Sequence, residues 1–200
     1  MNIDIQSLAG IISISAFGIY IYNIWRGKTR PSRSSWWIIT AVWVVLLLSS
    51  ISLSPGDTFV EKWNNVASNW ISLSYIIGSL IIAISSLWRG SSEKWGMFDW
   101  LCLLLATVSV VVYFALDKPL LSLVASVLAD FFGILPTVKN AWKFPAQEHM
   151  LAWFLEVVAS GLVVFAVVNW SITPAGVADW SSHLYLSIMN GIIMLLVACR

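Results

Sequence analysis

Charged residues are scarce in this chain. Asp, Glu, Lys and Arg together make up 10% of its 200 residues, whereas hydrophobic residues make up 59%. Soluble globular proteins carry about 25% charged residues, so this sequence could not cover a water-facing surface. The composition therefore predicts an all-α integral membrane protein. The net charge of +1 also argues against a nucleic-acid partner, because binding to phosphates requires clustered basic residues.

Residues that carry chemistry are also few. The two cysteines, Cys102 and Cys199, both fall in apolar segments and indicate neither a disulfide framework nor a metal cluster. His149 and His183 fall on opposite sides of the predicted membrane, which excludes a metal site shared between them. No predicted span contains a lysine that could form a retinal Schiff base, and no nucleophile pattern or phosphate-binding loop is present. We therefore expect no enzymatic activity, no metal and no cofactor.

Long apolar runs fill most of the chain. A membrane-spanning helix needs roughly 20 mostly apolar residues, and seven segments meet this requirement. They are residues 4–25, 36–53, 66–88, 97–116, 119–139, 150–170 and 181–199. The sequence thus predicts seven transmembrane helices.

The positions of the basic residues predict an orientation. With the N-terminus outside and the C-terminus in the cytoplasm, only Lys62 and Lys118 fall in outer loops. The inner loops and C-terminus then hold the other nine basic residues, which are Arg26, Lys28, Arg30, Arg33, Arg89, Lys94, Lys139, Lys143 and Arg200. Such an excess is typical of cytoplasmic loops.

A short pattern occurs twice. Asn23, Trp25 and Trp36 share the spacing N-x-W-x10-W with Asn140, Trp142 and Trp153, and in each copy the last Trp opens a new apolar segment. Two copies beginning in the first and fifth predicted spans indicate two parallel three-helix repeats joined by a linker helix. The predicted units are residues 1–95, the linker helix 96–117 and residues 118–200. Parallel repeats are one known plan of membrane transporters.

The second copy resembles the PQ-loop motif, in which a Pro-Gln pair near the inner end of a helix precedes a basic loop and a Trp-bearing helix. Residues 135–140 read Leu-Pro-Thr-Val-Lys-Asn, and Lys143, Glu148 and Trp153 follow. Thr137 replaces the Gln of the family, and the first copy has Gly18-Ile19 where the pair would stand. The PQ-loop family includes SWEET sugar transporters and cystinosin-like lysosomal exporters. The resemblance implies a seven-helix transporter with three helices on either side of a linker helix.

Three polar residues are predicted to lie deep in the membrane. Counting about 1.5 Å per residue from the inner boundary places Asp130, Glu156 and Asn190 about 10 to 15 Å deep, near a common level. A carboxylate at such depth is costly and is a functional candidate by default. The resemblance implies a proton-coupling role for Asp130 and a substrate-facing role for Asn190. The alternatives are packing for Asp130 and Asn190, and for Glu156 a pairing with Asp130 or a position facing an inner vestibule.

Pro136 is the predicted hinge, since proline in a helix frees a carbonyl and permits a bend. Gly18 would supply weaker flexibility in the first span, and a static kink is the alternative for Pro136. We therefore expect a transporter of a small neutral or weakly polar solute, with a site between the repeats and possible proton coupling. A non-transporting sensor or an assembly subunit is the alternative function. The sequence does not identify the substrate or the oligomeric state, and it is compatible with a homo-oligomer.

Overall fold

The structure is a computed structural model that describes residues 5–66, 69–91, 96–115, 119–166 and 172–199. Secondary structure in these ranges is helical throughout. The helices are α1 (Ile5–Trp25), α2 (Arg33–Leu53), α3 (Phe59–Asn65), α4 (Asn69–Arg89), α5 (Met97–Ala115), α6 (Pro119–Lys143), α7 (Met150–Ala166) and α8 (Pro174–Ala198), with a short 3-10 turn η1 (Pro145–Gln147). The all-α prediction is therefore confirmed for the described residues.

Five of these helices are long and apolar enough to cross a membrane. The spans are Ile5–Trp25, Arg33–Leu53, Trp70–Arg89, Leu123–Lys143 and Trp180–Ala198. Two further apolar segments, Met97–Val112 and Met150–Ala166, are shorter. The described helices are thus compatible with a multi-pass membrane protein.

Several helix boundaries differ from the predicted spans. α2 begins at Arg33 rather than at residue 36, and α8 begins at Pro174 rather than at residue 181. These starts lie outside the apolar runs because a helix can continue beyond the hydrocarbon layer, and proline is well tolerated in the first turn. Also outside the description are Lys94, Lys118 and Arg200, together with residues 4, 67–68, 116 and 167–170 of the predicted spans.

The short helix α3 was not predicted. Thr58 is its N-cap, and Glu61 completes a capping box in which each side chain bonds the other residue's backbone N–H. This Thr-x-x-Glu pattern is a known start signal for helices. The signal was therefore present in the sequence, in the loop between two predicted spans.

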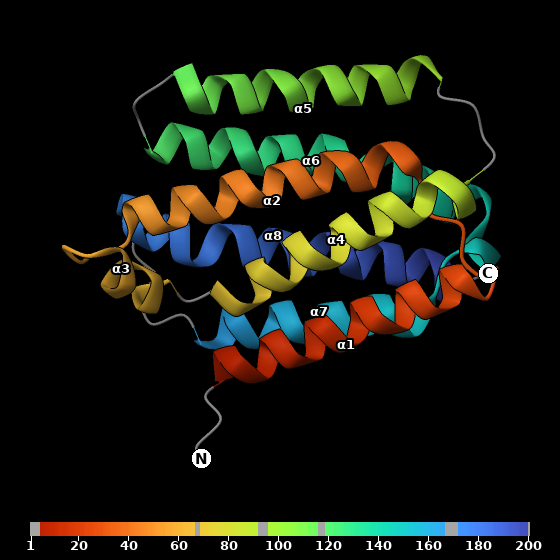
Figure 1. The fold of residues 1–200 in the computed structure, drawn as a ribbon, viewed down its shortest axis with the longest axis horizontal. Coiled ribbons are helices and arrows are strands. Elements are labelled where there is room, and N and C mark those ends of the chain that lie inside the picture. Colours follow the sequence, from red (N-terminus) through yellow and green to blue (C-terminus); the bar gives the residue numbers. More distant parts are fainter. Residues whose placement is uncertain (1–4, 67–68, 92–95, 116–118, 167–171, 200) are drawn as a thin grey trace.

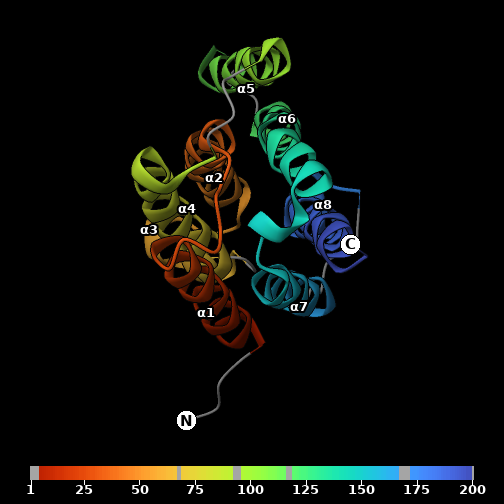
Figure 2. The same ribbon diagram turned by 90° about the vertical axis from the view of Figure 1, so that its right-hand side faces the viewer.

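The long helices form two rows (Figures 1 and 2). α1, α4 and α2 make one row, and α7, α8 and α6 make the other, with α4 and α8 in the middle positions. The rows meet where α1 packs against α7 and where α2 packs against α6. α5 lies outside the two rows and contacts α6 and α2. One hydrophobic core joins both rows and includes Ile24, Val42, Ile82, Leu123, Val163 and Leu186.

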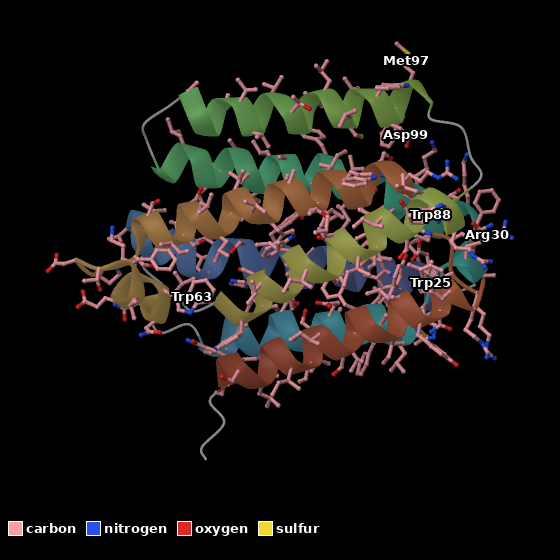
Figure 3. All side chains as sticks on the ribbon, viewed as in Figure 1. Trp25, Arg30, Trp63, Trp88, Met97 and Asp99 are labelled. Atoms are coloured by element: carbon pink, nitrogen blue, oxygen red, sulfur yellow. The ribbon has the colours of Figure 1, made fainter. Side chains whose placement is uncertain are left out.

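The two ends of the bundle differ in charge. The loops after α1 and α6 lie at one end together with the last turn of α4, and we call this the basic end. Its basic residues are Arg26, Lys28, Arg30, Arg33, Arg89 and Lys143. Trp25 and Trp88 lie at this end with exposed side chains, whereas Trp63 of α3 lies at the opposite end (Figure 3). Exposed tryptophans at helix ends are typical of residues at a membrane interface.

Candidate functional site

The two copies of the repeated pattern occupy matching positions. The first Trp of each copy, Trp25 and Trp142, is 56% exposed, and the second, Trp36 and Trp153, is 4% exposed. The buried pair stacks face to face across the two rows, with ring centroids 6.2 Å apart and an interplanar angle of 30°. The last Trp of each copy thus lies on its own side of one contact between the two rows.

The loops of the two copies are also joined. The Arg30 N–H donates to the Gln147 carbonyl at 2.9 Å, and the Asn140 side-chain amide donates to the Arg30 carbonyl at 3.4 Å. In the first copy, the Asn23 carbonyl accepts the N–H groups of Lys28 and Thr29. The contacts of the two asparagines therefore differ, since Asn23 bonds the loop after α1 through its backbone carbonyl, whereas Asn140 bonds that loop through its side chain.

Glu148 lies at the centre of the basic end, between η1 and α7. Its Oε2 accepts the Tyr20 hydroxyl at 2.7 Å and the Trp153 indole N–H at 3.1 Å, and its Oε1 accepts the Asn140 amide at 3.2 Å. Only 7% of Glu148 is exposed. The carboxyl thus ties α1, α6 and α7 together, and we call these four residues the Glu148 latch.

The environment of Glu148 changes its acidity. Burial raises the pKa of Glu148 from 4.5 to about 7, and the hydrogen bonds from Tyr20, Trp153 and Asn140 lower it in part. Burial dominates because the free energy lost when the carboxylate leaves water is larger than the free energy gained from its three hydrogen bonds. The latch therefore contains an acid that titrates close to neutral pH.

A series of aromatic rings leads from the latch into the bundle. Tyr20 contacts Trp36 and Trp153, Phe17 contacts Trp36 and Tyr75, and Tyr75 contacts Trp43, with centroid separations of 4.4 to 6.3 Å. We call these six residues the aromatic seam. A cavity of about 20 Å³ lies beside the seam, with Ala16 and Glu156 in its wall. That volume holds about one water molecule, so the rings close the space between the latch and Glu156.

Glu156 lies in a buried polar network. The Ser13 hydroxyl lies 3.0 and 3.2 Å from its two carboxyl oxygens, and the Ser74 hydroxyl donates to Ser13 at 2.6 Å. The Tyr75 hydroxyl lies beside the same carboxyl and accepts the Asn190 amide at 2.9 Å. Two of the three predicted deep polar residues, Glu156 and Asn190, therefore meet through Tyr75.

Asp130 lies apart from this network. It is 1% exposed, and its Oδ2 accepts the Tyr185 hydroxyl at 3.0 Å. The Trp43 indole lies beside the carboxyl, but Trp43 Nε1 and Asp130 Oδ1 are both buried without a hydrogen bond. Trp43 in turn packs on Tyr75. An indole and a phenol ring thus separate Asp130 from Glu156, and the two carboxyls are not hydrogen-bonded to each other.

The predicted hinge residues have different surroundings. α6 continues through Pro136 to Lys143 without interruption, and Pro136 is buried. Gly18 is exposed on α1, where an added Cβ would meet nothing within 4 Å. Bending at either position stays a prediction.

Sequence reasoning missed several residues of this site. The sequence predicts Glu148 only as part of the loop, and it predicts no role for Tyr20, Tyr75, Tyr185 or Ser13. A signal for Glu148 was present, because it is an acidic residue in a basic loop between Asn140 and Trp153. The tyrosines and the serine carry no such signal, since their roles depend on which helices face each other.

Comparison of the chain with protein-family models, with curated proteins and with solved structures finds no match.

Proposed function

We propose that this protein is a multi-pass membrane transporter of a small solute, built from two related three-helix units with α5 as the linker between them. The observation that carries the proposal is the Trp36–Trp153 stack, which joins corresponding residues of the repeated pattern across the two rows. Helix contacts support the same relation. α1 packs on α7 as α6 packs on α2, and α4 and α8 occupy the middle of their rows.

A site between two related units suits transport, because rocking of one unit against the other exposes it alternately to the two sides. The polar groups around Glu156 and Asn190 lie at such a position. The aromatic seam and the Glu148 latch would close it toward the basic end, which the positive-inside bias assigns to the cytoplasm. The orientation and the resemblance to the PQ-loop family are part of the proposal.

Proton coupling through Asp130 is a further part of the proposal. Asp130 is buried and has one unpaired carboxyl oxygen, so a proton could bind or leave there without breaking the Tyr185 hydrogen bond. If Asp130 couples protons, solute uptake rises when a pH gradient is imposed, and Asp130→Asn removes that dependence. A pH dependence that is unchanged in the variant would contradict this role.

Alternating access can be tested without knowing the solute. Ala16 lines the closed cavity beside Glu156 and is 1% exposed. We would replace Cys102 and Cys199 by serine, introduce Ala16→Cys, and reconstitute the protein with a single orientation in liposomes. A membrane-impermeant thiol reagent would then be added either outside or inside the vesicles.

A transporter is expected to be labelled at position 16 from both sides, because its site opens to each in turn. Labelling from one side only would favour a sensor, and labelling from neither side would favour an assembly subunit. Either result would contradict the transport proposal. Leu123→Cys, at a fully buried core position, serves as the control for labelling through unfolding.

A further inference from the structure

A groove of about 300 Å³ runs between α1 and α4. Its rim is apolar and exposed, since Ile14 is 58% and Ile77 is 52% exposed. Its wall also contains Gly18, where an added Cβ would meet nothing within 4 Å, and Gly78, which is covered by the Phe17 ring. Because α1 and α4 both contain candidate membrane spans, an exposed apolar rim between them would face lipid in a bilayer.

The floor of the groove leads to a carboxyl group. Ser74 lines the groove and donates to Ser13, which is hydrogen-bonded to Glu156. Phe17 lines both the groove and the closed cavity next to Glu156. Its ring lies over Gly78, where an added Cβ would come within 2.2 Å of the ring. A rotation of the Phe17 side chain would therefore join the groove to the cavity.

The positions of the charged side chains indicate the sign of the charge that a ligand of this site would carry. Among the described helices, every Lys and Arg lies near a helix end, and Lys139 is paired with Asp99. The buried ionisable side chains of the described helices include the carboxyls Asp130 and Glu156 and the imidazole of His183. The described groups that contact the Glu156 carboxyl are the hydroxyls of Ser13 and Tyr75, and no basic side chain is among them. An anion would therefore meet no counter-charge there. A cation would meet a carboxyl group and the faces of aromatic rings, which attract cations.

A second groove of about 210 Å³ between α2 and α5 provides a contrast. Its lining includes Trp37, Leu103 and Thr107 and, like that of the α1–α4 groove, contains no carboxyl group. Volume and an apolar surface alone therefore do not distinguish the α1–α4 groove. The hydrogen-bonded path to Glu156 does.

We propose that a hydrophobic organic cation without a carboxylate enters from the bilayer through the α1–α4 groove and binds with its charged group at Glu156. This inference rests on the proposed transport function, for which it names the substrate class. It departs from the small neutral or weakly polar solute expected from the sequence, because the tertiary structure gathers aromatic rings around a carboxyl group.

The test measures binding to the full chain in lipid nanodiscs by equilibrium dialysis, with empty nanodiscs subtracted. The probe is benzyltrimethylammonium, and its neutral carbon isostere, neopentylbenzene, is the matched ligand control. We expect saturable binding of the cation and no competition by the isostere. Glu156→Gln should weaken binding about 30-fold or more, because it removes one partner of a buried charge pair. Glu61→Gln, on the exposed helix α3, should leave binding unchanged.

A second pair of variants tests the route. Gly18→Leu fills the groove at a position where an added Cβ meets nothing within 4 Å, and Gly191→Leu makes the same change in equally open space on α8. Both replace a helical glycine, so both should fold. Gly18→Leu is expected to weaken cation binding about tenfold or more, and Gly191→Leu should not.

The proposal is overturned if the cation does not bind saturably, if the isostere competes equally, or if Glu156→Gln or Gly18→Leu binds like the wild type. Its failure is distinct from failure of the transport proposal. Access to Ala16→Cys from both sides without cation binding would leave a transporter of another substrate. Cation binding with access from one side would leave a cation site in a protein that does not transport.

Discussion

Replacing Glu148 by glutamine is expected to change how the stability of this protein depends on pH. The wild-type carboxyl is buried and accepts three hydrogen bonds, from Tyr20, Trp153 and Asn140. Glutamine has the same shape and no charge. Its carbonyl can accept from Tyr20 and Trp153, and its amide can donate to Asn140 Oδ1, which is buried without a partner.

The magnitude follows from the acidity of Glu148. Its pKa is raised from 4.5 to about 7 in the folded protein, so the folded state holds the proton to a higher pH than the unfolded chain does. The stability linked to that proton is fully present below pH 4.5 and is lost as the pH rises through about 7. At about 1.4 kcal/mol per pKa unit, the total is about 3 kcal/mol. Glu148→Gln lacks this loss.

Thermal unfolding of the detergent-solubilised protein, followed by tryptophan fluorescence, measures the effect. Relative to the wild type, the Tm of Glu148→Gln should rise by about 6 to 12 °C between about pH 4.5 and pH 8. Subtracting the two curves removes the groups common to both proteins. Glu148→Ala should instead be less stable throughout, because it leaves buried donors unpaired at about 1–3 kcal/mol each. A Tm difference between glutamine variant and wild type that is constant with pH would refute the reasoning.

Two further predictions concern packing and the buried network. Gly78→Ala places a Cβ within 2.2 Å of the Phe17 ring and should lower the free energy of unfolding by about 1–3 kcal/mol. The control, Gly191→Ala, has open space at its Cβ and should be neutral or stabilise the protein by up to about 1 kcal/mol. Equal Tm values for the two variants would contradict the close contact at Gly78. Asn190→Leu removes the amide that donates to the Tyr75 hydroxyl and should lower stability by about 1 kcal/mol. An unchanged Tm in that variant would show that the hydrogen bond contributes nothing net.

Much of the fold could be predicted from local pattern. Apolar runs located the long helices, because a helix in lipid needs a continuous apolar surface whatever its neighbours are. Their ends were less predictable, as the earlier starts of α2 and α8 show, since hydropathy measures the hydrocarbon layer and helices continue past it. The sequence contains the capping box of α3, but a helix of seven residues has no long apolar run by which hydropathy could detect it.

The candidate site was only partly predictable. Depth along a helix is fixed by residue count, so Asp130, Glu156 and Asn190 could be recognised as buried polar residues. Their partners could not, because a contact between helices depends on rotation about each helix axis. Glu156 therefore proved to be bonded to Ser13 rather than to Asp130, and Glu148 gained its three partners from helices far apart in the chain.

The sequence by itself determined that this is a helical chain apolar enough for a membrane, with a repeated Asn-Trp-Trp pattern and two carboxyl groups deep in its predicted spans, since these follow from composition, spacing and helix rise. Only the tertiary structure decided that Trp36 stacks on Trp153, that Glu148 joins α1, α6 and α7 through hydrogen bonds, and that a groove between α1 and α4 leads toward Glu156. Each of these depends on how two rows of helices face each other, and that arrangement is set by side-chain packing over the whole bundle rather than by any local segment.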